Sequence, residues 1–482
     1  MASLHLRARA AAFWREYTRM RTAILFLIGV ALIVLVGSFV PQQDTSAPGK
    51  VDAFLLDHSN LNALATHLGL PLTQVFVSPL FLGLLASLYL ALGACVIRRA
   101  RALALRTARG YPRTPQFWGE WGSWLFHASF FLLLVAVLYG KSTGFEGLMT
   151  VTEGQRVTEA RGSFDQLKQG LLFDGHHSGF DVQLNRFSAT YAASGAPTDF
   201  VSDVTVYDHG QPVLRKNIRV NDFLEYNGVD YYQQDYGWAP HLVVRNPAGQ
   251  VVFDSPVQVF GEDKSQETGA LKVPDFGYTL PATTVPVQIG ANLTVYPDAR
   301  TIARLGSDGS IAGSTAGPGG QEARNPVVML GLFVGDLGLS AGAPQNVNDL
   351  DTARMQPYFA DGHAVALSLG QSLQLPLHGG DCTDPQASGC FTVSFSELRQ
   401  YSLFQVKKDS GVPFVYVTFG LIMLGLLTKL YARPLLEARQ RRLRVAPPGG
   451  AQAAATDHAM AEPVGAGTGR DPDSGVAGVG RR

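Results

Sequence analysis

One histidine lies inside a long apolar segment, where an ionisable side chain is unusual. His127 belongs to residues 120–139, a run of almost entirely apolar side chains. A run of that length can cross a hydrocarbon layer of roughly 30 Å as a helix. An ionisable group at such a depth is costly, so it should face protein, water or a ligand rather than lipid. A neutral imidazole there can ligate iron, carry protons or hydrogen-bond a neighbouring helix.

Aromatic residues accompany this histidine at helical spacing. Trp124 precedes His127 by three positions and Phe131 follows it by four, which places all three on or near one helix face. Such side chains would suit the walls of a site for a flat, apolar macrocycle with iron at its centre. The alternative is structural: Trp118, Trp121 and Trp124 form an interfacial aromatic belt, and the imidazole makes a buried polar contact.

The other candidates for chemistry are few. The chain has three cysteines and no C-x-x-C pair, which excludes a disulfide scaffold and a zinc ribbon. Cys382 and Cys390 lie in a polar loop and are expected to pair if that loop faces an oxidising compartment, with thiol exchange as the alternative. The vicinal pair His176 and His177 is expected to be exposed in a loop rather than to bind metal.

Charge and motifs exclude several function classes. Equal numbers of basic and acidic residues, 39 of each, provide no domain-wide positive field for nucleic acid. The nucleophile elbow G-x-S-x-G, the zinc motif H-E-x-x-H and the phosphate-binding P-loop are all absent. Hydrolytic and nucleotide-dependent catalysis therefore have little support.

The elements that position His127 are predicted from the clustering of apolar residues. Four segments are long enough to span a membrane. The first follows a basic start and resembles a signal peptide, but it is longer than a usual signal core and no small-x-small cleavage site follows it, so we expect it to be retained. The predicted spans are residues 22–40, 79–97, 120–139 and 412–431.

Clusters of arginine orient these spans. Arginines gather before the first span, between the second and third, and after the fourth. The positive-inside rule places all three regions in the cytoplasm. The predicted domains are a cytoplasmic N-terminus (1–21), an outer loop (41–78) with a short amphipathic helix near 60–70, a basic cytoplasmic loop (98–119), an extracytoplasmic domain (140–411), and a basic, then disordered, cytoplasmic tail (432–482).

The extracytoplasmic region shows alternation typical of strands rather than helices. Residues 180–187, 203–207 and 391–395 alternate apolar and polar side chains between turn residues. We expect a β-rich, sandwich-like domain. The Gly-rich residues 306–320 are expected to be a flexible loop, and the aromatic residues 231–238 to be core or a partner contact.

Several short motifs together resemble one family. Leu125-Phe-His127 enters the third span, Gly144-Phe-Glu-Gly147 and Val151-Thr-Glu-Gly154 follow it, and Gln405-Val-Lys-Lys-Asp-Ser-Gly leads into the last span. Gly37-Ser-Phe-Val-Pro41 closes the first span, and Tyr231-Tyr-Gln-Gln-Asp-Tyr-Gly237 lies in the outer domain. These motifs cover residues 13–445 in order. The chain resembles the ResB family, the membrane subunit of the System II cytochrome c synthase.

The resemblance implies a function in haem handling. Such proteins work with a membrane partner of the ResC/CcsA type, and the pair moves haem b outward and attaches it to the C-x-x-C-H thiols of an apocytochrome c. His127 matches the family's histidine that is implicated as an axial ligand of the haem iron, with Trp124 and Phe131 beside it. The partner's Trp-rich motif is absent, so this subunit is not expected to be an active enzyme alone.

Two hypotheses therefore remain. The first is a haem-delivery subunit in the plasma (cytoplasmic) membrane with both termini inside. The second is a non-catalytic scaffold whose outer domain binds partners while His127 is structural. Basic residues near the cytoplasmic side, namely Arg98, Arg99, Arg101 and Arg113, are candidates to pair with haem propionates. Topology alone is the simpler interpretation of these arginines.

Overall fold

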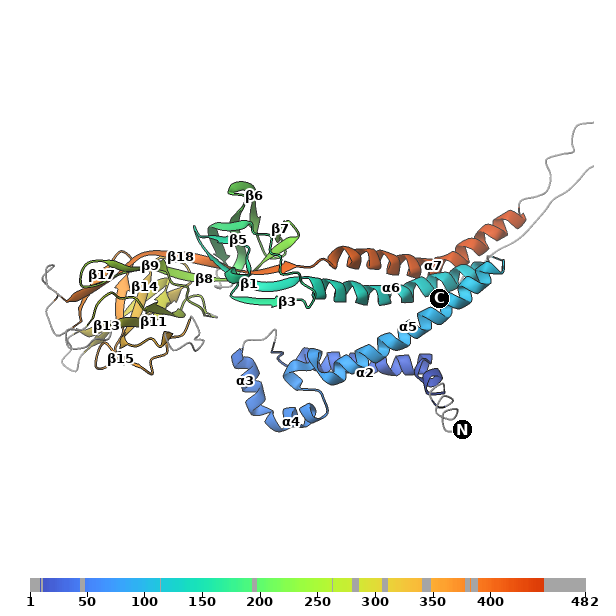
Figure 1. Cartoon of the computed structure of the whole chain (residues 1–482), viewed down its shortest axis with the longest axis horizontal. Coiled ribbons are helices and arrows are strands. Elements are labelled where there is room, and N and C mark those ends of the chain that lie inside the picture. Colours follow the sequence, from blue (N-terminus) through green and yellow to red (C-terminus); the bar gives the residue numbers. More distant parts are fainter. Residues whose placement is uncertain are drawn as a thin grey trace, which may run out of the picture. The chain divides into compact units, whose positions relative to one another are not determined.

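Two compact units make up the chain. The computed structural model (Figure 1) describes residues 9, 12–43, 48–112, 114–192, 197–261, 263–279, 286–305, 311–339, 348–377, 382 and 389–445. One unit combines Met1–Cys95 with His127–Ile422, and the other combines Val96–Phe126 with Met423–Arg482. All three points at which the chain passes from one unit to the other fall inside helices.

Four long apolar helices have the length and composition needed to cross a membrane. Three of them precede a large region of β-sheet and one follows it. Each contains an 18-residue stretch of high hydropathy with at most two charged side chains, which is typical of helices surrounded by lipid. The predicted fold class, a four-span membrane protein with a β-rich domain before the last span, is confirmed. The helices are α2 Met20–Phe39, α5 Pro79–Ala108, α6 Pro115–Thr143 and α7 Val412–Val445.

The helices extend beyond the apolar runs that predicted them. The apolar run of α5 ends at residue 97, but the helix continues to Ala108 because Ala, Leu and Arg are good helix formers. Gly110 ends it in the left-handed conformation at φ +69°, and Pro112 follows. Helix α6 begins at Pro115, where the Thr114 hydroxyl accepts the Phe117 N–H at 3.3 Å. The basic segment 98–119 is therefore mostly helical.

The segment between α2 and α5 folds into short helices. α3 spans Pro48–Asp57, α4 spans Ser59–His67 and the 3₁₀ helix η1 spans Leu72–Val77. The predicted helix near 60–70 corresponds to α4, which ends before Gly69 at φ +77°. The Gln42 side chain donates to the Leu72 carbonyl and accepts the Val75 N–H, both at 3.1 Å. These bonds hold η1 against the end of α2.

Glycines let α6 and α7 approach to backbone contact. In the unit formed by residues 96–126 and 423–482, a Cβ added at Gly425 would lie 2.6 Å from the Phe126 nitrogen and 3.0 Å from the Gly122 oxygen. In the other unit, a Cβ at Gly411 would lie 2.4 Å from the Ala136 oxygen and 2.9 Å from the Gly140 Cα. Within a membrane, small residues of this kind allow the close van der Waals packing that drives helix association.

The region between α6 and α7 consists of antiparallel strands. A seven-stranded sheet has the order β3-β1-β18-β8-β7, with β17 and β9 paired to its long strands. A four-stranded sheet has the order β2-β4-β5-β6, and a five-stranded sheet has the order β10-β11-β14-β15 with β16 on β14. The strands are β1 Phe145–Thr152, β2 Arg156–Thr158, β3 Gln166–Gln169, β4 Asp181–Tyr191, β5 Pro197–Asp208, β6 Gln211–Ile218, β7 Leu224–Tyr226, β8 Val229–Arg245, β9 Val251–Pro256, β10 Glu267–Val273, β11 Gln288–Tyr296, β12 Asp298–Leu305, β13 Ile311–Gly320, β14 Val327–Gly335, β15 Met355–Pro357, β16 Val365–Ser368, β17 Ser372–Pro376 and β18 Cys390–Lys408.

Two hydrophobic cores share the long strands β8 and β18. These strands pair from Lys407↔Asp230 to Thr392↔Arg245, so one sheet serves both cores. At the end of the sheet that continues into the helices, Met149, Val182 and Phe404 pack in one core. At the other end, residues of β8, β11, β14 and β18 form the second core. The alternating patterns had predicted this sandwich-like packing of sheets.

The Gly-rich region differs from its prediction. Residues 311–320 were expected to be a loop, but β13 pairs antiparallel with β12 in a two-stranded sheet. The loop prediction was therefore wrong for this part, because a backbone ladder needs no side chains to form. Residues 306–310 lie outside the described residues.

The contact between α6 and α7 predicts a position-specific effect of adding one methyl group. In Gly425→Ala, the new Cβ meets backbone atoms that cannot move aside, so we expect a loss of about 1–3 kcal/mol. Gly420→Ala on the same helix is the matched control, since a Cβ there meets nothing within 4 Å. Thermal unfolding in detergent measures the difference. Equal melting temperatures for the two variants would contradict close packing at Gly425.

Candidate functional site

His127 lies in the third apolar helix, as its sequence position predicted. Helix α6 is continuous from Pro115 to Thr143, so His127 is preceded by three turns and followed by four. Its side chain is half-buried. A half-buried imidazole on a membrane helix faces other protein groups or a ligand rather than lipid alone.

Trp124 contacts the preceding membrane helix. Its indole Nε1–H donates to the Val96 carbonyl of α5 at 3.1 Å. The Trp121 ring packs against the Trp124 ring in a T-shaped arrangement, with centroids 5.4 Å apart. Val96 lies inside α5, where its carbonyl oxygen is an acceptor for the helix backbone. That oxygen has two lone pairs, so it can also accept the indole N–H. The ring is thereby fixed on the α5 side of α6.

Phe131 also contacts α5. A Cβ added at Gly93 would lie 3.3 Å from the Phe131 ring, so the glycine leaves the space that this ring fills. Since His127 follows Trp124 by three residues and precedes Phe131 by four, helix geometry places the imidazole on the face that carries both rings. The sequence predicted this common face; it did not predict that each ring packs on α5.

An apolar groove lies farther along α6. It has a volume of about 330 Å³ and lies between α6 and α7 in the unit that contains His127. Its lining is almost entirely hydrocarbon, and Thr418 and Tyr139 are the residues in it that carry hydroxyl groups. Such a groove accepts an acyl chain, a helix or a flat apolar ring equally well. The lining residues are Leu132, Val135, Ala136, Tyr139, Phe414, Val417, Thr418 and Leu421.

The cysteines occupy two different environments. Cys382 and Cys390 are joined by a disulfide with their Cα atoms 6.0 Å apart. Cys95 is a half-buried free thiol on α5. In the part of the chain that the structure describes, no three His, Cys, Asp or Glu side chains gather as a metal site would require.

The pair His176 and His177 was only half correctly predicted. His176 is exposed, but the His177 side chain is only 8% exposed and its Nδ1 lies 2.6 Å from Oε1 of the fully buried Glu159. The prediction of two exposed histidines was wrong for His177, because aromatic rings from separate segments cover it. These rings are Phe145, Phe164 and Phe173.

The aromatic residues 231–238 are core rather than an exposed contact. They form the first half of β8, where Tyr231 is fully buried and Trp238 is 4% exposed. Tyr236 stacks on Phe187, and its hydroxyl lies 2.7 Å from that of Tyr191. The side chains therefore stabilise the domain from inside.

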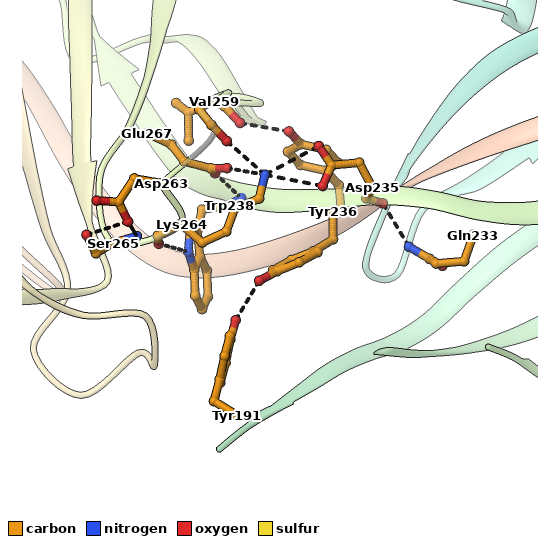
Figure 2. A network of polar contacts seen from close by, with 12 residues as sticks. Tyr191, Gln233, Asp235, Tyr236, Trp238, Val259, Asp263, Lys264, Ser265 and Glu267 are labelled. Carbon is orange, nitrogen blue, oxygen red and sulfur yellow. Dashed lines mark hydrogen bonds and ion pairs between the residues drawn. The ribbon is translucent and has the colours of Figure 1, made fainter. Parts of the chain in front are cut away.

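A buried ionic network adjoins this segment. Figure 2 shows the Lys264 ammonium pointing toward two carboxylates, with Glu267 Oε1 at 2.8 Å and Asp235 at 3.4 Å. Glu267 Oε2 accepts the Trp238 backbone N–H at 2.7 Å, and the Trp238 indole donates to the Lys264 carbonyl at 3.1 Å. Burial raises the pKa of Glu267 to about 7, although the Lys264 ammonium opposes that rise. Motif searches miss this network because its partners come from β8, from the loop before β10 and from the first residue of β10.

These features define a class: a membrane protein whose third span carries one histidine among aromatic residues, and whose β-rich domain lies before the last span. The family model described as the ResB-like family matches residues 20–118 and 116–443. Those two ranges cover most of the chain. The chain belongs to the ResB-like family, as the sequence motifs had predicted.

Individual relatives agree with the family. The cytochrome c biogenesis protein CcsB of Synechococcus sp. (strain JA-3-3Ab) is 24% identical over 465 residues, which cover 86% of this chain and 80% of the relative. The chloroplastic cytochrome c biogenesis protein CCS1 of Oryza sativa subsp. japonica is 26% identical over 236 residues, covering 40% of this chain and 42% of the relative. The chloroplastic CCS1 of Arabidopsis thaliana is 31% identical over 142 residues, covering 29% of this chain and 25% of the relative.

The raised pKa of Glu267 predicts that stability falls as pH rises. The folded state holds a proton on Glu267 up to about pH 7, whereas the unfolded chain releases it near 4.5. The free energy of unfolding should therefore be highest below about pH 4.5 and should fall by up to about 3 kcal/mol toward pH 7. Hydrogen exchange of β10 between pH 5 and 8 measures this change.

Two variants test whether Glu267 causes this fall of stability with rising pH. Glu267→Gln removes the titrating group, so the fall of protection with pH should disappear. Glu322→Gln, at an exposed carboxylate paired with Arg324, should keep the wild-type slope. The assignment is wrong if Glu267→Gln retains the same fall.

Proposed function

We propose that this chain is the haem-export and delivery subunit of a System II cytochrome c synthase. The relatives named as cytochrome c biogenesis proteins support the process, since making a cytochrome c involves haem. The observation that carries the haem role is His127, an imidazole inside the apolar helix α6 with Trp124 and Phe131 on its face. In this proposal the imidazole is an axial ligand of the iron of haem b.

The arginine clusters support an orientation for this path. They flank the spans on one side, at the N-terminus, in the segment from α5 to α6, and after α7. By the positive-inside rule this side is the cytoplasm, and the β-rich domain lies outside the plasma (cytoplasmic) membrane. His127 is twelve residues into α6, and it follows Glu120 by seven residues or roughly 10 Å of helix. The imidazole would then meet haem in the inner half of the bilayer.

Each part of the chain would perform a separate task. The neutral imidazole would hold the iron through a nitrogen lone pair, and the aromatic rings beside it would exclude water. Release of the iron would break that bond, and a new ligand would take the coordination position. A membrane partner of the ResC/CcsA type would supply that ligand and the outer site where haem is joined to the C-x-x-C-H thiols of an apocytochrome c.

The β-rich domain would serve as the docking part of this subunit. Its two cores are joined by β8 and β18, and β18 continues directly into α7. Only residues 409–411 separate this strand from the last span, so a partner docked on the domain would be joined to that span by a short connection. This domain contains no grouping of catalytic motifs, so the covalent step would depend on the partner, and the subunit alone would be inactive.

Replacing the histidine tests the haem role. His127→Ala should lose the bound haem of the purified complex, seen as the Soret band per protein, and should abolish cytochrome c maturation. Added imidazole should restore part of the Soret band, because a free ligand can occupy the space left by the side chain. His176→Ala, at an exposed histidine, is the matched control and should retain both activities. Retained haem and normal maturation in His127→Ala would favour a scaffold whose histidine is structural.

Labelling of single cysteines tests the orientation. In a Cys95→Ser background, Leu171→Cys should react with an impermeant maleimide in intact spheroplasts, because residue 171 is 98% exposed and belongs to the proposed outer domain. Leu435→Cys, at an exposed position beyond the predicted span 412–431, should react only after permeabilisation. The opposite pattern would place the β-rich domain in the cytoplasm and overturn the outward path.

A further inference from the structure

A lysine-lined pocket lies where the third and fourth spans join the β-rich domain. It has a volume of about 170 Å³, several times the roughly 30 Å³ that one water molecule occupies in the liquid. All of its lining belongs to the unit that contains residues 127–422. Four of the nine lysines of the chain line it together with two carboxylates, so the lining carries two net positive charges. The charged lining residues are Lys141, Glu146, Lys168, Lys407, Lys408 and Asp409.

Strand pairing brings several of these side chains to one face. Glu146 of β1 lies opposite Lys407 of β18 on one side and opposite Lys168 of β3 on the other. Residues directly opposite each other in a ladder point to the same face of a sheet, so two lysines flank one carboxylate. Lys141, near the end of α6, adds a third lysine, with its Nζ 3.1 Å from Glu146 Oε2. One carboxylate thus lies among three lysines.

Backbone contacts fix the walls of the pocket. A Cβ added at Gly144 would overlap the Lys408 carbonyl oxygen, and one added at Gly170 would overlap the Ser142 carbonyl oxygen. The Gly170 N–H also donates to the Gly144 carbonyl at 2.9 Å. The end of α6 and the strands β1, β3 and β18 therefore meet with their backbones in contact, and the lysines extend from a rigid frame.

The pocket lies at the level of lipid headgroups. The apolar run of the third span ends at residue 139, and Gly140 and Lys141 follow it directly. Lys141 is therefore roughly 3 Å of helix beyond the hydrocarbon, whereas the headgroup region extends roughly 5–7 Å beyond it. On the fourth span, Asp409 precedes the apolar run 412–431 by three residues. The phosphates of the surrounding leaflet are thus within reach of the lysine side chains.

Membrane topology does not explain these lysines. The positive-inside rule accounts for the arginine clusters, which flank the opposite ends of the same spans. Of the four arginines that the sequence singled out there, Arg99 donates to Ser123 of α6 at 2.9 Å, and Arg113 lies outside the described residues. At the domain end of the spans the rule favours few basic residues, so four lysines in one pocket need another explanation.

We propose that this pocket binds the phosphate of an anionic phospholipid in the leaflet on the side of the β-rich domain. A lysine ammonium binds a phosphate as a point charge with three donors, so several lysines can share one phosphate without a fixed orientation. A zwitterionic headgroup brings its own positive charge near the lysines, and an anionic one therefore fits the net charge of the lining better. The bound lipid ties the junction of spans and domain to the leaflet. The proposal is independent of the haem role.

Hydrogen exchange of the full-length protein in nanodiscs tests the proposal. Discs of phosphatidylcholine are compared with discs in which phosphatidylglycerol replaces a rising fraction of that lipid. In the wild type, phosphatidylglycerol should slow the exchange of residues 166–170 and 407–411, because a bound lipid opposes local opening. Equal exchange in the two kinds of disc would overturn the proposal without any variant.

Removing two of the lysines tests their part in binding. Lys168→Gln combined with Lys408→Gln keeps both printed ion pairs of the lining, at Glu146 and at Asp409. This variant should bind phosphatidylglycerol about tenfold or more weakly, because each lysine near a membrane surface contributes roughly fivefold to the attraction of anionic lipid. Lys168→Arg combined with Lys408→Arg keeps the charges and should retain the wild-type protection. Unchanged protection in the glutamine variant would contradict the proposal.

The matched control is Lys216→Gln combined with Lys272→Gln. It removes the same number of lysines from the β-rich domain at positions outside the pocket lining. It should keep the wild-type protection, and an equal loss in this control would show a general effect of net charge and overturn the assignment to the pocket. Unchanged exchange of β11 and β14 in phosphatidylcholine discs shows that each variant is folded.

Two further arms separate other occupants. Inorganic phosphate added to phosphatidylcholine discs should give no comparable protection, and protection by phosphate alone would assign the pocket to a free anion instead of a lipid. A glutamine variant that keeps the lipid-dependent protection but loses a protein that co-purifies with the wild type would assign the pocket to a partner. His127→Ala should keep the lipid-dependent protection, so failure of the proposed function and failure of this proposal are distinguishable.

Discussion

The close pairing of two helix–strand segments is the constraint on which the structure depends. Helix α6 leads into β1 at the start of the β-rich domain, and β18 leads into α7 at the end of that domain. The strands pair from Phe145↔Lys408 to Thr152↔Tyr401, and the helices meet at glycines with no room for a Cβ. Backbone hydrogen bonds in water and van der Waals packing in lipid thus hold the same two segments together. The last span is tied to the third although more than 260 residues separate them.

Because β1 and β18 are paired, the large domain between them does not separate the third span from the fourth. Both termini of the insertion are fixed in adjacent strands, so the rest of the domain can be elaborated around β8 and β18. One core packs near the strand ends that continue into the helices, and the second packs at the far ends of the same strands. The buried Lys264–Glu267 pair lies beside Trp238, between these two groups of residues. Breaking this contact would leave a buried polar group without its hydrogen bond, which is costly, so the contact restricts how the two halves of the domain can shift.

What the sequence predicted follows from how local each signal is. Membrane spans, alternating strands and the isolation of His127 in an apolar run depend on residues near each other in the chain, so they are readable without a structure. The burial of His177 is not local: it depends on Phe145, Phe164 and Glu159 from segments up to 32 positions away. The arginine-rich extension of α5 was missed for a different reason. Hydropathy marks where lipid ends, whereas the helix ends where glycine and proline interrupt it.

The order of groups along α6 matches the chemistry proposed for the cargo. His127 comes first, and Leu132, Val135 and Tyr139 line the apolar groove farther along the helix. A molecule with a metal at its centre and an apolar ring would find a matching environment for both parts in that order. Strong binding of both the metal and the ring would also hold the molecule in place, because the free energies of the two contacts would combine within one molecule. Within the proposed function, delivery would therefore need a partner that competes for at least one of these contacts.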